Sequence, residues 1–345
     1  MTPPPARRSS VGRVVAVVVA GVALYVLMPA LVKVFDSWPR LLHLEVWWLI
    51  AGLAGEVASF ACAMALLRLV LRTSSWFAVV TAGMAGNAVT NTLPGGDAVG
   101  ASVQYRMLAG SGIDTVQAAS GLAVSSIIGV SALFALPVFA LPVILGGTTV
   151  SPGLVHAGEL GAVGFVLLVA FGVTALSTDR VLLTLGVVLQ WVVDHLPSRV
   201  RRSRHDQPMG ERLLAERDAV REDLGRNWWK AVLLVAGRIG LDFFSLIAML
   251  EAAGTRPHPA LVLLAYSATA VLALLPLTPG GLGIVEASLS GLLILADVPS
   301  ANAVVATLAF RIGSYWLPTA VGAVCYVLYR RRYGALSANG APSRA

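Results

Sequence analysis

Several ionisable residues lie inside or beside long apolar runs, where a charge is costly unless it is paired or has a function. Arg238 and Asp242 stand four residues apart, so a helix would place them on one face, where they could pair. Arg311 lies in the last apolar run. Its guanidinium could bind a carboxylate or a lipid phosphate through two hydrogen bonds, and Glu286 is the expected carboxylate. The full set is Glu56, Asp97, Arg106, Arg238, Asp242, Glu286 and Arg311.

Some of these charges also have a purely structural explanation. The pair Arg238 and Asp242 could be an internal bridge that only neutralises two charges. Glu286 lies three residues after Gly283, where a carboxylate at a helix N-terminus is stabilised by the backbone dipole. Asp97 has a comparable place after an earlier turn. The sequence leaves both explanations open for these residues.

Two similar turns interrupt the apolar runs. Leu93-Pro94-Gly95-Gly96 is followed by Gly100, and Thr278-Pro279-Gly280-Gly281 is followed by Gly283. Pro and Gly end a helix, and self-similarity in two halves indicates internal duplication. We therefore predict that the turns and the nearby charges bind substrate, through Pro94, Gly95, Gly96, Asp97, Arg106, Arg238, Asp242, Pro279, Gly280, Gly281, Gly283, Glu286 and Arg311.

The composition determines which elements must position these residues. Of 345 residues, 57% are hydrophobic and 12% are charged, too few charges to cover a soluble fold of this size. The sequence predicts an all-α, polytopic helical membrane protein. Apolar runs that could span the membrane cover residues 14–35, 45–67, 76–93, 116–145, 161–176, 228–249, 261–275 and 304–328.

The formal charge of +7 comes from basic residues at the chain start, in a central loop and after the last apolar run. This placement follows the retention of Lys and Arg on the cytoplasmic side, so nucleic-acid binding is not expected. It predicts a plasma-membrane protein with both termini in the cytoplasm. The expected segments are a tail at 1–13, membrane halves at 14–177 and 228–329, an Arg-rich loop with an amphipathic helix at 178–227, and a tail at 330–345.

The same charges predict opposite orientations for the two turns. The first pair of short helices starts beside Arg72 and ends near Arg106, so both of its ends are expected in the cytoplasm. The second pair starts from an outer loop at Arg256 and must return outside before the last span. If both pairs are re-entrant hairpins, the halves form an inverted repeat, which in transporters places the binding site near mid-membrane. The alternative is that one or both runs simply span.

Motifs for soluble catalysis and cofactor binding are lacking. No phosphate-cradling Gly-x-x-x-x-Gly-Lys run, nucleophile elbow or zinc-spaced histidine pair occurs. Cys62 and Cys325 lie in apolar runs and define no disulfide framework. We expect no cofactor and no metal site.

Three segments together resemble a known family. Pro279-Gly280-Gly281-Leu282-Gly283-Ile284-Val285-Glu286, Leu93-Pro94-Gly95-Gly96 and Arg311-Ile312-Gly313-Ser314-Tyr315-Trp316-Leu317-Pro318 are similar to the transmembrane region of lysylphosphatidylglycerol synthase/flippase proteins. The resemblance covers about residues 14–329 and implies flipping of an aminoacylated lipid. No aminoacyl-transfer domain follows the last span here, so synthesis of that lipid is not expected.

The expected function is therefore a lipid flippase, in which arginines neutralise a phosphate while Glu286 and Asp97 contact the head group. The expected partner is a phospholipid or lipid-linked substrate. A second copy of the chain and a separate lipid-modifying enzyme are further candidate partners. Two alternatives stay open: a membrane-embedded transferase, or its accessory, acting on lipid-linked sugars, and a membrane scaffold that docks a cytoplasmic protein through the Arg-rich loop.

Overall fold

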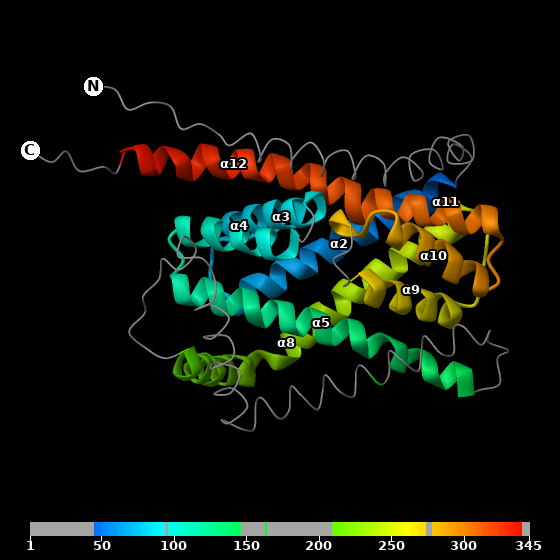
Figure 1. Cartoon of the computed structure of the whole chain (residues 1–345), viewed down its shortest axis with the longest axis horizontal. Helices are drawn as coiled ribbons and strands as arrows, with labels where there is room; N and C mark the ends of the chain where they lie inside the picture. The colour runs from blue at the N-terminus through cyan, green and yellow to red at the C-terminus, as the bar shows by residue number, and fades with distance from the viewer. Residues whose placement is uncertain (1–44, 94–95, 146–162, 164–208, 274–277, 340–345) are drawn as a thin grey trace, which may run out of the picture.

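The structure is a computed structural model that describes residues 45–93, 96–145, 163, 209–273 and 278–339. These residues form helices and short connections, without a strand (Figure 1). The elements are α2 (Val46–Val70), α3 (Trp76–Thr92), α4 (Gly96–Gly110), α5 (Thr115–Leu145), α8 (Met209–Ala252), α9 (Pro259–Ala273), the 3₁₀ turn η1 (Pro279–Gly281), α10 (Ile284–Leu295), α11 (Ser300–Arg311), the π-helical segment η2 (Ile312–Trp316) and α12 (Leu317–Asn339).

In the described part of the chain, three stretches are long and apolar enough to cross a membrane: Val46–Val70, Trp228–Ala252 and Ser300–Tyr333. Large apolar side chains also face outward, as Trp47 does with 83% exposure and Ile127 with 65%. An apolar outer surface of this kind is what a lipid environment requires. The prediction of an all-helical membrane protein is confirmed. The predicted span at 14–35, and the one at 161–176 apart from residue 163, lie outside the described residues.

One helix is longer than the sequence indicated, and another continues through two prolines. The amphipathic helix predicted in the loop at 178–227 and the span predicted from 228 form one 44-residue helix, α8. A single Gly225 between them costs only about 1 kcal/mol against Ala, too little to end a helix whose neighbours favour it. Helix α5 continues through Pro137 and Pro142 over 31 residues, because neighbouring groups in a membrane protein can satisfy the backbone that proline frees.

Helices α2 and α8 pack closely and run antiparallel. The Glu45 amide donates to the Ala252 carbonyl (3.2 Å), and the Ser59 hydroxyl donates to the Arg238 carbonyl (2.8 Å). The approach depends on glycine, since a Cβ at Gly52 would lie 2.7 Å from the Met249 Cε atom. Small residues let membrane helices approach in this way.

Two hairpins extend from opposite ends of this antiparallel pair. The α3–α4 hairpin begins where α2 ends, and its base lies against the end of α12, where the Tyr329 hydroxyl donates to the Met107 carbonyl (2.7 Å). Helices α9 and α10, on either side of η1, form the second hairpin. It begins where α8 ends and finishes where α11 begins, and there the Asn302 amide donates to the Ala253 carbonyl (2.6 Å). Figure 1 shows the α3–α4 hairpin and the α9–α10 pair at opposite ends of the molecule.

Candidate functional site: the junction of the two turns

The tips of the two hairpins meet at Tyr315. The Tyr315 hydroxyl donates to the Asn91 carbonyl (2.7 Å) in the last turn of α3. A Cβ at Gly280 would lie 3.0 Å from the Asn91 Cα atom and would collide with the Tyr315 ring. Gly280 also has a φ of 54°, a conformation that glycine adopts without penalty. The second turn therefore contacts the end of α3, directly before the first turn, although Asn91 and Gly280 lie 189 residues apart in the sequence.

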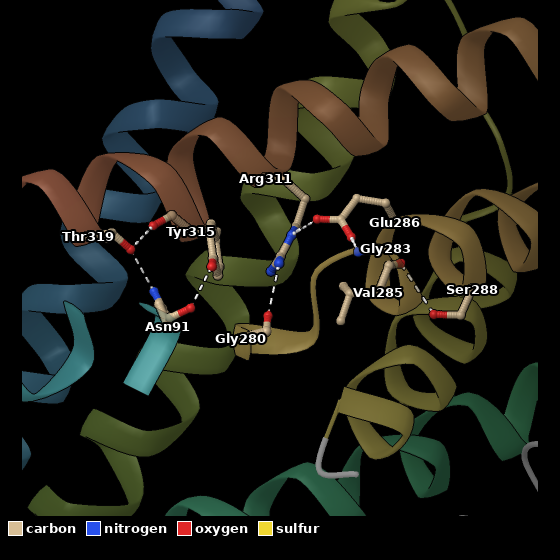
Figure 2. Close-up of polar contacts among 9 residues, drawn as sticks. All are labelled: Asn91, Gly280, Gly283, Val285, Glu286, Ser288, Arg311, Tyr315 and Thr319. Carbon is tan, nitrogen blue, oxygen red and sulfur yellow. Dashed lines mark hydrogen bonds and ion pairs between the residues drawn. The ribbon is translucent and has the colours of Figure 1, made fainter. Parts of the chain in front are cut away.

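Arg311 and Glu286 form an ion pair at this junction (Figure 2). The Arg311 Nε atom lies 2.7 Å from the Glu286 Oε1 atom, and an Arg311 terminal nitrogen donates to the Gly280 carbonyl (3.1 Å). The guanidinium carbon also lies 4.3 Å from the centre of the Tyr315 ring, a cation–π distance. The residue as a whole is 9% exposed. Arg311 thus joins the second turn to the last span.

Glu286 makes two contacts that the sequence indicated, the helix cap and the pair with Arg311. Its Oε2 atom accepts a hydrogen bond from the Gly283 amide (2.6 Å) and so caps α10, while Oε1 pairs with Arg311. Gly283 precedes the helix with a φ of 82°. A capped and charge-paired carboxylate can be buried at moderate cost.

A chain of uncharged polar groups continues from Tyr315 into the first hairpin. The Asn91 amide donates to the Thr319 hydroxyl (2.8 Å), and that hydroxyl donates to the Tyr315 carbonyl (2.6 Å). Figure 2 shows these side chains between α3 and the last helix. Residues Ile312–Trp316 are π-helical, an irregularity that often occurs at functional sites because it changes the direction of side chains.

A second polar cluster lies in the same core. Glu56 on α2 is 1% exposed, and both of its carboxylate oxygens lack a hydrogen-bond donor among the described residues. Its side chain packs against η2, where a Cβ at Gly313 would lie 3.1 Å from the Glu56 Cγ atom. The Asp242 carboxyl group is in contact with it and accepts a hydrogen bond from the Tyr266 hydroxyl.

The structure brings only some of the predicted site residues together. Pro279, Gly280, Gly281, Gly283, Glu286 and Arg311 make up the second turn and its ion pair. Asp97 and Arg106 have exposed side chains and form no ion pair with the described residues. Gly96 is buried against the backbone of Thr90 and closes the first hairpin. Pro94 and Gly95 lie outside the described residues.

Arg238 and Asp242 do not form the predicted salt bridge in the described part of the chain. The Arg238 side chain is directed toward α5, since one of its terminal nitrogens would lie 3.5 Å from a Cβ at Gly129. Asp242 faces Glu56 and Tyr266 instead. Residues four apart share a helix face, but here two different neighbouring helices attract the two side chains.

Sequence reasoning missed three residues of the junction and its surroundings. Asn91 directly precedes the first turn, and its polarity in an apolar run was a usable signal. Tyr266 and Thr319 carry no such signal, because a single Tyr or Thr in an apolar run is common in membrane helices. Glu56 stood out as a charge in the membrane but had no predicted partner.

Two comparisons with known proteins identify the family. Residues 13–322 match the family described as Lysylphosphatidylglycerol synthase TM region. Over 96 residues the chain is 30% identical to a UPF0104 membrane protein of Methanothermobacter thermautotrophicus, an alignment that covers 28% of this chain and 27% of that relative. The family match covers both turns, Glu286 and Arg311. This chain therefore belongs to the lysylphosphatidylglycerol synthase transmembrane-region family.

Proposed function

We propose that this chain is a transporter rather than an enzyme, and that it moves a phospholipid or lipid-linked head group between the leaflets of the plasma membrane. The observation that carries the proposal is the buried pair of Arg311 and Glu286, held where two hairpins from opposite ends of the molecule meet. Charges buried in membrane proteins are rare, and they commonly mark the path of a polar substrate.

Arg311 is suited to a lipid phosphate. Its Nε atom contacts Glu286 and a terminal nitrogen contacts Gly280, so N–H groups remain that make no hydrogen bond with the described residues. A guanidinium binds phosphate through two parallel hydrogen bonds. In the proposed cycle the phosphate competes with Glu286 for Arg311, which loosens the second turn from the last span while the acyl chains stay in lipid.

The proposed membrane arrangement has both hairpins re-entrant and the two halves inverted, with both termini in the cytoplasm. It is supported by the opposite ends from which the hairpins extend and by the contact between Asn91 and Gly280 at their tips. Non-helical backbone at membrane depth is stable only where it is buried in protein or lines a watery cavity. Discontinuous helices of this kind bind the substrate in several transporter folds.

Labelling of single cysteines tests this arrangement. In a variant without Cys62 and Cys325, cysteines at Thr115 and Ser300, both exposed positions, should react with an impermeant maleimide from opposite sides of the membrane. Thr115 should react from the cytoplasm and Ser300 from outside. Labelling of both from one side would contradict the inverted arrangement.

Head-group flipping in proteoliposomes tests the function itself. Fluorescent phosphatidylglycerol, lysylphosphatidylglycerol, phosphatidylethanolamine and a polyprenyl phosphate would be compared with an impermeant quencher; the family description makes the aminoacylated lipid the first candidate. We expect at least one lipid to flip faster than in protein-free vesicles. Glu286→Gln should slow it about tenfold or more, because the carboxylate that positions Arg311 and takes it back after the phosphate leaves is lost. Folded protein that accelerates none of the four lipids would count against a flippase.

A further inference from the structure

Glu56 is a buried carboxyl group that has neither a hydrogen-bond donor nor an ion pair among the described residues to stabilise its charged form. It lies in the middle of α2, is 1% exposed, and has no hydrogen-bond donor to either oxygen among the described residues. Gly52 and Gly55, in the same helix as Glu56, allow α8 to approach closely. Gly313 allows η2 to pack against the methylene groups of Glu56. A carboxylate that is neither hydrated nor paired is strongly disfavoured in such surroundings.

The group that faces Glu56 is a second carboxyl group. Asp242 on α8 lies beside Glu56, because a Cβ at Gly55 would lie 3.2 Å from the Leu241 carbonyl and Ser59 donates to the Arg238 carbonyl, and the two carboxyl groups interact electrostatically. Two carboxylates in contact repel each other, and the contact becomes a hydrogen bond only when one of them carries a proton. The Tyr266 hydroxyl, from α9, donates to Asp242 and so favours Asp242 as the acceptor and Glu56 as the protonated partner.

The charged groups around the pair come from two elements. Arg238 on α8 and Arg311 at the end of α11 interact electrostatically with Asp242, and Arg238 also does so with Glu56. Neither arginine forms an ion pair with Glu56 or Asp242 within the described residues. Of the other elements that pack on α2, helices α3 and α5 contain no ionisable residue, and η2 contains only Tyr315. The nearby arginines therefore balance one negative charge on the two carboxyl groups, and a second negative charge there would be unbalanced.

We propose that Glu56 and Asp242 form a proton-binding site in which the two carboxyl groups hold one proton between them. On release, the O–H bond breaks, its electron pair stays on the carboxylate oxygen, and the proton passes to water. No group of three His, Cys, Asp or Glu side chains that could hold a metal ion occurs among the described residues, which favours a proton over a metal ion as the ligand.

Arg311 connects this site to the junction of the two turns. It interacts with the Asp242 charge on one side and pairs with Glu286 on the other. Loss of the proton adds a negative charge on the Asp242 side, which weakens the hold of Glu286 on Arg311. This coupling rests on the proposed function, because it links proton release to the step in which Arg311 exchanges Glu286 for a phosphate.

Infrared spectroscopy of the purified full chain tests the site without any transport assay. At neutral pH the spectrum should contain the carbonyl stretch of a protonated carboxylic acid, and Glu56→Gln should remove it. The substitution keeps the volume of the side chain, and its amide can donate to Asp242, so folding is preserved. Glu251→Gln is the matched control, because Glu251 is on α8 like Asp242 but pairs with exposed Arg256 (3.0 Å). It should leave the signal unchanged.

The absence of the signal in the wild type, or its persistence in Glu56→Gln, would overturn the proton-binding site. Flipping under a pH gradient tests the coupling: one pH unit is a tenfold difference in proton activity and should change the wild-type rate by up to about tenfold, while Glu56→Gln should not respond. A wild-type flipping rate that does not change with the pH gradient would overturn the coupling. A normal infrared result with no flipping at any pH would refute the flippase but leave the site intact.

Discussion

Replacing Arg311 by Gln should reduce lipid flipping at least tenfold and lower the free energy of unfolding by about 3–5 kcal/mol. The substitution leaves Glu286 buried without its cationic partner, a loss that costs this much in buried pairs. It also removes the donor to the Gly280 carbonyl and the cation above the Tyr315 ring. Flipping in proteoliposomes and thermal unfolding in detergent would measure the two effects.

The double substitution Arg311→Gln with Glu286→Gln separates binding from stability. It removes both charges, so most of the lost stability should return, as it does when both members of a buried pair are replaced together. Flipping should stay low, because no guanidinium is left for the phosphate. Recovery of flipping in the double variant would show that the pair is a structural bridge only. Arg256→Gln, which breaks the exposed pair with Glu251, is the control for loss of a salt bridge and should change either property little.

Replacing Gly280 by Ala should cost about 2–5 kcal/mol of stability and abolish most of the flipping. The new Cβ would lie 3.0 Å from the Asn91 Cα and carbonyl oxygen atoms and would collide with the Tyr315 ring. Overpacking of a close contact costs about 1–3 kcal/mol, and the φ of 54° adds about 1–2 kcal/mol for a residue with a side chain. The two turns would have to move apart.

Gly291→Ala is the matched control for this change. Gly291 lies in α10, directly after the same turn, and a Cβ there would meet nothing within 4 Å. Alanine should stabilise that helix by up to about 1 kcal/mol. If Gly280→Ala behaved like Gly291→Ala in unfolding and in flipping, contact between the turns would be unimportant for either property.

The local part of the site could be predicted from the sequence. Pro279 and the glycines after it end one helix and begin the next, and the carboxylate at the third helical position caps it. These interactions join residues only a few positions apart, so spacing alone reveals them. Arg311 could be named as a partner for Glu286 because few cations lie in the apolar runs of the second half.

The pairing of Glu56 with Asp242 could not be predicted in this way. They lie on α2 and α8, and only the glycine-mediated approach of these two helices brings their carboxyl groups together. The same holds for Tyr266, which reaches Asp242 from α9. In the sequence, Arg238 is the obvious partner of Asp242, and that prediction was wrong because the side chain of Arg238 lies toward α5.

Composition and hydrophobic run length were enough to establish a helical membrane protein, because too few charges are present to cover a soluble fold. The two turns, the cap at Glu286 and the charges in the apolar runs also followed from local spacing. The fold alone decided that Tyr315 joins the second turn to the end of α3, that α8 is one long helix, and that Glu56 and Asp242 come close on α2 and α8. Contacts between distant segments depend on how closely helices approach and in which direction their side chains lie, and a single sequence records neither quantity.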